Sequence, residues 1–255
     1  MLLRLALLLA LLPFPSVLAQ AEHPLTGRHI APVMGAAGAD WLERRERERE
    51  EQPGRALDLI GIQPGMTVAD VGAGTGYMTL RIAKRVGPTG KVYANDIQPE
   101  MLDKLNENAR RANLDNIETV LGSEADAKLP AGKMDFIILV DVYHEFSRPQ
   151  EMLQSMRKAL KPDGRLVLLE YKREEPSIPI RPDHKMFTAD VTIEVEAEGY
   201  KLDKVIDTLP RQHIIFFSRL TPVAAGTLDR PYSLPTPGLE QRPDRFEFFG
   251  KAFQL

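Results

Sequence analysis

The stretch VADVGAGTGY, residues 68–77, joins a short apolar run to a helical pattern. Glycines at alternate positions of this stretch let the backbone turn sharply and come close to a ligand. A glycine-rich loop alone is weak support for a nucleotide site, because a plain strand-to-helix turn has the same composition. The context strengthens the prediction, since Asp96 ends the next predicted strand, where an open α/β sheet places a carboxylate for ribose hydroxyls.

Two common nucleotide loops fit this stretch poorly. The dinucleotide fingerprint requires Gly or Ala at the sixth place counted from Gly72, where this chain has the bulky Tyr77. A phosphate-binding loop requires Gly-Lys-Ser/Thr, which this stretch lacks. Asp70, two residues before the first glycine, would repel a pyrophosphate but attract an ammonium or sulfonium group. The charge of the loop therefore favours S-adenosylmethionine over NAD as its ligand.

Strand and helix patterns alternate regularly from residue 67 onward. The predicted strands cover residues 67–71, 92–95, 117–121, 136–140 and 166–169, and the predicted helices cover residues 77–86, 99–112 and 150–160. Short links between alternating strands and helices indicate an α/β fold with a mostly parallel sheet and helices on both faces. A further helix over residues 188–198 precedes two strands, 202–206 and 213–217, which we expect to form an antiparallel hairpin at the edge of the sheet.

Four segments in this order resemble the class I S-adenosylmethionine-dependent methyltransferases. They are VADVGAGTGY from residue 68, VYANDIQPEML from residue 92, MDFIILVDVYHEF from residue 134 and LKPDGRLVLLEY from residue 160. The resemblance covers about residues 55–219 and is nearest to the small-molecule branch that includes the ubiquinone and menaquinone enzymes. It implies a Rossmann-like sheet of seven strands, mostly parallel, with an antiparallel last strand.

The same resemblance implies a cofactor site for S-adenosylmethionine in the glycine loop and in the segments after later strands. Its residues would be Asp70, Gly72, Ala73, Gly74, Gly76, Tyr77, Asp96, Ile97, Glu124, Asp126 and Val140. Asp96 would hold the ribose hydroxyls, Ile97 would lie against adenine, and Tyr77 would lie near the methionine carboxyl end. After the third strand the family often has Gly-Asp-Ala, whereas this chain has GSEAD at residues 122–126, so either Glu124 or Asp126 could contact adenine.

Polar residues follow the fourth predicted strand, at the carboxyl edge where such sheets bind ligands. We predict His144 and Asp141 as the catalytic residues, with His144 as general base or as the group that positions the acceptor. The alternative for His144 is a structural histidine bonded to a loop carbonyl. Asp141, His144 and Glu170 could instead hold a divalent metal, but their spacing is not diagnostic and we predict no metal. His184 and Lys185 are expected to be an exposed loop pair.

Composition limits the function classes. The 255 residues are 43% apolar and 27% charged, which is typical of a globular chain and not of a collagen or a polytopic membrane protein. The net charge of −3 and the lack of a basic stripe argue against nucleic acid as a partner. The chain contains no cysteine, which excludes a disulfide framework and a thiolate metal site.

The N-terminus is predicted to be a targeting segment. Residues 1–21 read MLLRLALLLALLPFPSVLAQA, with one early Arg, a leucine-rich run and small residues at the end. This order is typical of a signal peptide, so we expect an exported protein, periplasmic or secreted. An uncleaved anchor, and with it a membrane association, is the less favoured alternative, because the apolar run before Pro13 is short for a span.

The rest of the chain divides into three predicted parts. Residues 22–54 form a leader with a charged run at 41–51, which we expect to be an exposed helix because Glu and Arg alternate at helical spacing. Residues 55–220 form the methyltransferase domain, and residues 221–255 form a Pro-rich tail. The leader and the tail are both candidates to cover the pocket.

Three functions are compatible with these patterns. The first is a methyltransferase that acts on a small-molecule acceptor. The second is an exported, non-catalytic protein that keeps the fold and binds S-adenosylmethionine, since a supply of this cofactor outside the cytoplasm is not obvious. The third is a nicotinamide oxidoreductase, against which Tyr77 and Asp70 both argue. The order of the four segments favours the first, and the sequence does not fix the oligomeric state.

Overall fold

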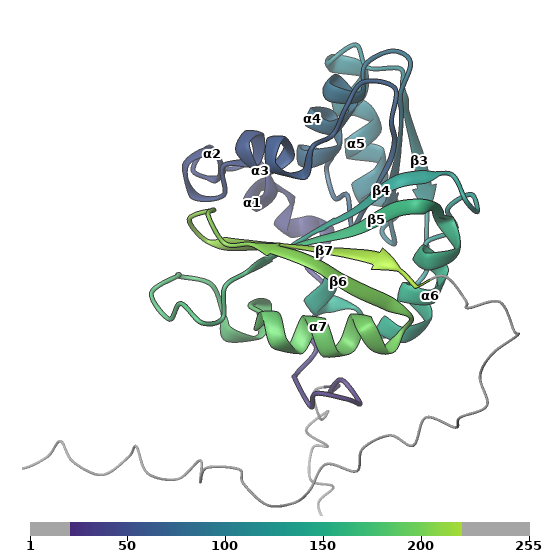
Figure 1. Cartoon of the computed structure of the whole chain (residues 1–255). Helices are drawn as coiled ribbons and strands as arrows, with labels where there is room; N and C mark the ends of the chain where they lie inside the picture. Colours follow the sequence, from purple (N-terminus) through teal and green to yellow (C-terminus); the bar gives the residue numbers. More distant parts are fainter. Residues whose placement is uncertain (1–20, 221–255) are drawn as a thin grey trace, which may run out of the picture. The chain divides into compact units, whose positions relative to one another are not determined.

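The computed structural model describes residues 21–220 (Figure 1). The predicted signal peptide, apart from Ala21, and the predicted tail after residue 220 lie outside the described residues. Across residues 21–220, every helix is too short or too polar to cross a bilayer.

Within residues 21–220, seven strands form one sheet in the order β3-β2-β1-β4-β5-β7-β6. Their bounds are β1 Thr67–Val71, β2 Lys91–Asp96, β3 Ile117–Leu121, β4 Met134–Val140, β5 Leu160–Tyr171, β6 Tyr200–Ile206 and β7 Gln212–Arg219. Strands β1 to β5 pair in parallel, whereas β7 pairs antiparallel with both β5 and β6. The predicted α/β fold with an antiparallel last strand is confirmed.

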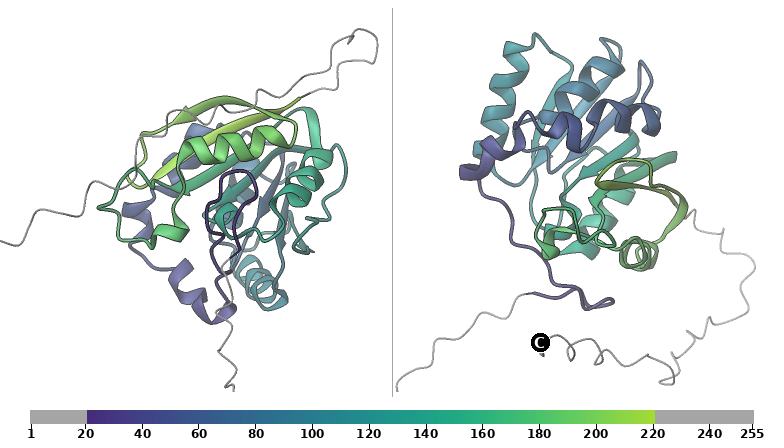
Figure 2. Two further views of the ribbon diagram at one scale, coloured as in Figure 1. Left: turned by 90° about the horizontal axis from the view of Figure 1, so that it is seen from below. Right: turned by 90° about the vertical axis from the view of Figure 1, so that its left-hand side faces the viewer.

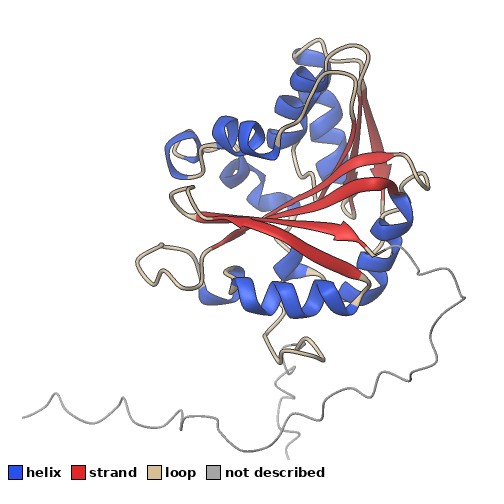
Figure 3. Cartoon of the chain, viewed as in Figure 1, coloured by secondary structure: helices blue, strands red, loops and turns tan. Residues whose placement is uncertain are grey.

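Helices cover both faces of the sheet, as Figures 1 and 3 show. One face carries α3 Pro53–Ile60, α4 Tyr77–Val86 and α5 Pro99–Arg111, and the other carries α6 Pro149–Ala159 and α7 Thr188–Ala197. Short helical turns lie at η1 Ala36–Gly38, α1 Ala39–Leu42, α2 Arg47–Glu50, η2 Tyr143–Glu145 and η3 Pro182–His184. The four helices predicted between residues 77 and 198 are found within a residue or two of their expected ends.

Alternation along the central strands explains why both faces are covered. In β4, Ile137 and Leu139 pack toward α6, while Ile138 packs toward α3 and α4. All three side chains are fully buried. Because successive side chains of a strand point to opposite faces, an unbroken apolar run requires helices on both sides.

The strand order creates a crevice at the middle of the sheet. The chain winds from β1 outward to β3 and then returns to the other side of β1 as β4. In such sheets, ligands bind outside the carboxyl ends of the strands at the point where the order reverses. The loops after β1 and β4 therefore face the same space.

The charged run at residues 41–51 differs from the prediction of one exposed helix. It contains two short helical turns, α1 and α2, with a break between them. Arg47 and Glu51 are buried, with 6% and 2% of their surface exposed. Arg47 Nε donates to Glu51 Oε2 at 2.7 Å, and Tyr171 Oη donates to Glu51 Oε1 at 2.7 Å. The charges neutralise one another, which allows this segment to turn inward and pack on the domain.

Residues 30–34, which we call the strap, run beside the carboxyl end of the sheet. The backbone N–H of Ala31 donates to the carbonyl of His144 at 2.9 Å. The N–H of Met34 donates to Glu145 Oε1 at 3.3 Å, and the Gln98 side chain donates to the carbonyl of Met34 at 3.1 Å. Figure 2 shows this N-terminal segment passing along one side of the domain. The strap thus connects the loop after β2 with the loop after β4.

Candidate active site

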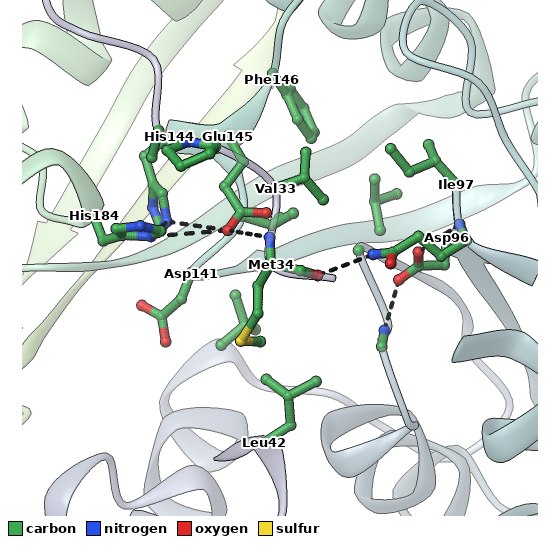
Figure 4. Close-up of a pocket in the computed structure, with 18 of the residues that line it drawn as sticks. Val33, Met34, Leu42, Asp96, Ile97, Asp141, His144, Glu145, Phe146 and His184 are labelled. Atoms are coloured by element: carbon green, nitrogen blue, oxygen red, sulfur yellow. Dashed lines mark hydrogen bonds and ion pairs between the residues drawn. The ribbon is translucent and has the colours of Figure 1, made fainter. Parts of the chain in front are cut away.

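A cavity of about 1010 Å³ lies at the carboxyl edge of the sheet, between the strap and the loops after β1, β2 and β4. This volume is at the upper end of the roughly 300–1,000 Å³ of typical ligand pockets, so the cavity has room for more than one reactant. Figure 4 shows Asp96 and Ile97 on one side of it, His144, Glu145 and His184 on the other, and Met34 between them. The cavity therefore has two chemically different ends.

The glycine loop forms part of the cavity wall with bare backbone. Gly72 and Gly74 line the cavity and have positive φ angles of 74° and 53°. A Cβ on Gly72 would lie 2.4 Å from Val142 Cγ2. A side chain at Gly72 would therefore strain the backbone and collide with the loop after β4. The glycine keeps these two loops in contact.

Asp96 occupies the end of β2 as predicted, and both Asp96 and Ile97 line the cavity. Asp96 Oδ2 accepts a hydrogen bond from the N–H of Gly74 at 2.9 Å, and Oδ1 accepts one from the N–H of Gln98 at 2.9 Å. Burial raises the pKa of Asp96, although hydrogen bonds from the backbone oppose this effect. An ionised carboxylate has about four acceptor positions, so Asp96 can still accept hydrogen bonds from a ligand's hydroxyls.

Of the two acidic residues predicted for the adenine end, only Glu124 lines the cavity. Asp126 accepts hydrogen bonds from Ser155 Oγ at 2.6 Å and from the N–H of Lys128 at 2.8 Å, both on Oδ1. The Ser155 bond is the main cause that lowers the pKa of Asp126. Asp126 thus stabilises its own loop, and the geometry favours Glu124 for the ligand contact.

We expect Glu124→Ala to weaken the binding of S-adenosylhomocysteine by about 2- to 10-fold, because one hydrogen bond contributes about 0.5–1.5 kcal/mol. Asp126→Asn, which keeps an oxygen for Ser155, should leave the Kd unchanged. Isothermal titration calorimetry of both variants decides between the two acids, and a larger loss for Asp126→Asn would reverse the assignment.

Asp70 does not line the cavity, although we predicted that it would face the cationic donor. Its side chain is buried, and Oδ2 accepts a hydrogen bond from Thr79 Oγ1 of α4 at 2.5 Å. This bond turns the carboxylate toward the helix that follows the glycine loop. Burial raises the pKa of Asp70 to about 6, although the Thr79 bond opposes this effect. The direct contact with a sulfonium or ammonium group is therefore not supported by this geometry.

The raised pKa of Asp70 predicts a pH-dependent effect on stability. A carboxyl group whose pKa rises from 3.8 to about 6 on folding stabilises the fold below pH 3.8, and this contribution is lost as the pH rises through 6. Asp70→Asn is neutral at every pH. Its free energy of unfolding relative to wild type should therefore increase by up to about 3 kcal/mol between pH 4 and pH 7.5. Urea denaturation without ligand measures this difference, and a difference independent of pH would mean that the carboxylate is solvated.

Three further predicted cofactor residues, Ala73, Gly76 and Tyr77, also lie off the cavity wall. Gly76 has a φ of 93° and precedes the first residue of α4, with Leu105 packed against it. Tyr77 Oη donates to Glu48 at 2.9 Å, and its ring lies 4.2 Å from the guanidinium carbon of Arg47. These residues shape the loop and hold the charged N-terminal turns against it.

His144 is held by a buried carboxylate. Glu170, at the end of β5, accepts from His144 Nδ1 at 2.6 Å with one oxygen and from the N–H of Tyr143 at 2.9 Å with the other. Both His144 and Glu170 are almost fully buried. Burial alone would lower the pKa of His144, but Glu170 outweighs this effect and raises it. The Nδ1–H bond to Glu170 leaves Nε2 of His144 as the nitrogen for chemistry on the cavity side.

Asp141, the other predicted catalytic residue, lines the cavity just after β4. Its φ of 52° is unusual for a residue with a side chain. Oδ2 accepts a hydrogen bond from Gln212 Nε2 at 2.7 Å, while Oδ1 is buried and has no hydrogen-bond partner among residues 21–220. Burial, together with the nearby carboxylates of Glu51 and Glu170, raises the pKa of Asp141 well above its usual range.

His184 and Lys185 are not the exposed loop pair that we expected. His184 lines the cavity, and its Nδ1 lies 3.1 Å from Nε2 of His144. Lys185 is buried and donates to the carbonyls of Glu175 and Ile178. The loop folds back on itself because these carbonyls satisfy the ammonium group. No local signal in the sequence places His184 opposite His144.

The metal set considered from the sequence, Asp141, His144 and Glu170, is not formed. Both oxygens of Glu170 are occupied by hydrogen bonds to His144 and Tyr143. Within the described part of the chain, the residues whose possible metal-ligating atoms lie close together are instead His144, Glu145 and His184. Burial raises the pKa of Glu145 to about 7, and burial together with His144 lowers the pKa of His184. The sequence assigned no role to Glu145, whereas the strap belongs to the leader that we named as a candidate to cover the pocket.

Comparison with known proteins agrees with this geometry. Residues 62–206 match the family model described as a methyltransferase domain. The UbiE ubiquinone/menaquinone biosynthesis C-methyltransferases of Escherichia fergusonii and Salmonella arizonae are each 33% identical to this chain over 118 residues. This match covers 46% of this chain and 47% of each relative, so the chain spans about half the length of these curated relatives.

Solved structures extend the likeness to about seven-tenths of the chain. A SAM dependent methyltransferase from Aquifex aeolicus is 28% identical with a TM-score of 0.69, covering 72% of this chain and 98% of that one. A structure from Sulfolobus solfataricus, described as a putative type 11 methyltransferase, is 20% identical with a TM-score of 0.57. The match covers 71% of this chain and 98% of that one and shows the same fold. Because the family model matches more than half of its residues, this chain belongs to the methyltransferase domain family.

Proposed function

We propose that this protein transfers the methyl group of S-adenosylmethionine to a small-molecule acceptor inside the cavity between the strap and the sheet. The observation that carries the proposal is a two-ended cavity at the switch point of the sheet. One end has bare backbone and a carboxylate, from Gly72, Gly74 and Asp96. The other end has His144, which the buried Glu170 holds from behind.

The first end suits the adenosyl part of the donor. Asp96 offers acceptor positions for ribose hydroxyls, Ile97 and Met101 offer apolar contact for a base, and Glu124 offers an acceptor for an exocyclic amine. The glycines allow the backbone to lie against the ligand without side chains between them. The Aquifex relative, a SAM dependent methyltransferase, supports this choice of donor.

The second end suits an acceptor. Apolar strap residues, together with Phe146 and Ile180, line the cavity near His144. The strap forms one wall of this space and is held there by hydrogen bonds to the loops after β2 and β4. A sulfonium methyl group is already activated, so the protein chiefly has to orient the two reactants, which contributes about 7–11 kcal/mol to catalysis. A base such as His144 is needed only when the acceptor must lose a proton.

A small acceptor agrees with the shape of the cavity and with the relatives. The UbiE relatives are named for C-methylation in ubiquinone and menaquinone biosynthesis. The cavity lies under a strap rather than on an open charged face, which favours a compact acceptor over a nucleic acid.

Calorimetry with S-adenosylmethionine and with S-adenosylhomocysteine tests the donor assignment. We expect one molecule of either ligand to bind per chain, and no binding at millimolar ligand would exclude the function. Methyl-labelled S-adenosylmethionine incubated with the protein and the small-molecule fraction of a cell extract then tests transfer. Label that never leaves the donor, although the donor binds, would favour a non-catalytic binding protein.

We propose further that the chain is exported, because residues 1–21 have the order of a signal peptide. Sequencing the N-terminus of the protein recovered from separated cell fractions tests this. We expect a mature chain that begins near Gln20 or Glu22 in the exported fraction. An intact Met1 in the cytoplasmic fraction would contradict the proposal.

A further inference from the structure

We propose that His144, Glu145 and His184 bind one divalent transition-metal ion, of the kind represented by Zn²⁺, at the acceptor end of the cavity. The three side chains come from η2 and η3, two helical turns that lie far apart in the sequence. All three line the cavity, and Figure 4 shows the two rings and the carboxylate facing one another. The binding of the ion does not depend on the proposed function. Only the role that we give to the ion rests on that function.

The distances between the donor atoms fit a single ion. His144 Nε2 lies 3.1 Å from His184 Nδ1, and Glu145 Oε1 lies 3.8 Å from His184 Nδ1 and 4.0 Å from His144 Nε2. A triangle with sides of 3.1, 3.8 and 4.0 Å has a circumradius of about 2.1 Å, so one point lies at that distance from all three atoms. Zinc ligands lie at about 2.0–2.2 Å from the metal, whether nitrogen or carboxylate oxygen.

The groups behind the three ligands hold them in a metal-binding form. His144 gives its Nδ1–H to the buried carboxylate of Glu170 at 2.6 Å, which leaves Nε2 with a free electron pair. A carboxylate that orients a ligating histidine in this way is a common feature of metal sites. Glu145 is fixed by the backbone N–H of Met34 in the strap at 3.3 Å. Two of the three ligands therefore need little rearrangement to bind an ion.

The donor set selects the type of metal. Two imidazole nitrogens and one carboxylate oxygen suit Zn²⁺, Fe²⁺ and similar ions, whereas Mg²⁺ and Ca²⁺ prefer oxygen ligands alone. A set of three protein ligands also leaves at least one coordination position open, as in catalytic zinc sites. Here the open position would face the cavity, because the three ligands line its wall.

An ion at this position would define the class of acceptor. Its open position would take an oxygen of the acceptor, such as a hydroxyl or enol group, and a bound metal lowers the pKa of such an oxygen. The ion would thus favour the deprotonated form of an oxygen-bearing acceptor at the end of the cavity opposite Asp96.

A hydrogen bond between His144 and His184 is the competing explanation of the 3.1 Å distance between their ring nitrogens, and it predicts no metal binding.

The test is Zn²⁺ binding to the full chain after removal of metals with a chelator. Calorimetry and equilibrium dialysis should give one Zn²⁺ per chain for wild type. His184→Ala should weaken binding at least about 100-fold, because removal of a ligand costs more than the 10- to 100-fold lost when a supporting residue is changed. His29→Ala is the matched control, since His29 is an exposed histidine that also lies near a carboxylate, Glu22, at 3.4 Å.

Glu145→Gln is the second ligand variant, in case His184→Ala alters the fold, which circular dichroism checks. The proposal is overturned if wild type binds no Zn²⁺, or if both ligand variants bind it as tightly as His29→Ala does. Binding of S-adenosylhomocysteine to the same proteins in chelator separates the two proposals. A protein that binds Zn²⁺ but not S-adenosylhomocysteine would contradict only the proposed function. A protein that binds S-adenosylhomocysteine but not Zn²⁺ would contradict only the metal site.

Discussion

Asp96→Ala is expected to weaken the binding of S-adenosylhomocysteine by about 10²- to 10⁴-fold. The carboxylate lies in the cavity wall at the end of β2 and has acceptor positions left for two ribose hydroxyls. A hydrogen bond to a charged group contributes about 1.5–3 kcal/mol, and two such bonds give the expected range. The substitution also removes the bond that holds the N–H of Gly74, so the glycine loop loses its support.

Calorimetry measures this effect, and Asp103→Ala is the matched control because Asp103 is an exposed carboxylate on α5, close in sequence to Asp96. Asp96→Asn keeps one oxygen for the N–H of Gly74 and separates the loss of ligand contacts from the loss of loop structure. It should still weaken binding by about 10-fold or more, since it removes the negative charge. A Kd within 3-fold of wild type for both Asp96 variants would contradict the placement of the ribose.

His144→Ala is expected to lower the rate of methyl transfer by about 10²- to 10⁴-fold, which is the usual contribution of a positioned acid or base. His144 is the only cavity-lining residue of the described chain that a buried carboxylate holds through a ring nitrogen, with Nδ1 at 2.6 Å from Glu170. The Kd for S-adenosylhomocysteine should change little, because Asp96, which accepts the N–H of Gly74, lies at the other end of the cavity (Figure 4).

The labelled transfer assay measures this rate once an acceptor is found, with His29→Ala as the control. Added imidazole should restore part of the rate of His144→Ala if the ring acts on the acceptor directly. A rate unchanged in His144→Ala would show that the acceptor needs His144 neither as a base nor as a metal ligand. The zinc measurements on His184→Ala then distinguish a base at His144 from a metal ligand.

Local patterns were sufficient to predict the fold. Apolar runs such as residues 136–140 identify strands, and their unbroken character predicts helices on both faces, as Ile137 and Ile138 bear out by packing in opposite directions. The glycine loop and Asp96 are also local signals, since each follows directly from a strand end. The charged run at 41–51 misled because the spacing of Glu and Arg fits an exposed helix and a buried ion-pair network equally well.

The sequence predicted the cavity residues that lie at or just after the end of a strand, but not the contacts between distant segments. Gly72 and Asp141 directly follow strands, Asp96 is the last residue of β2, and all three lie in the cavity wall. His184 reaches His144 from a loop 40 residues further along the chain, a contact that depends on how that loop folds. Asp70 has the right charge and the right place in the sequence, but Thr79 draws its side chain toward α4. Side-chain direction at such a turn depends on the packed structure and not on spacing.

The most direct test of the account is a crystal structure of the protein with S-adenosylhomocysteine. We predict the ribose hydroxyls at Asp96, the adenine beside Ile97 and Glu124, and the sulfur directed toward the His144 end of the cavity. A crevice that stays empty at saturating ligand, or a ligand whose ribose lies away from Asp96, would contradict the account.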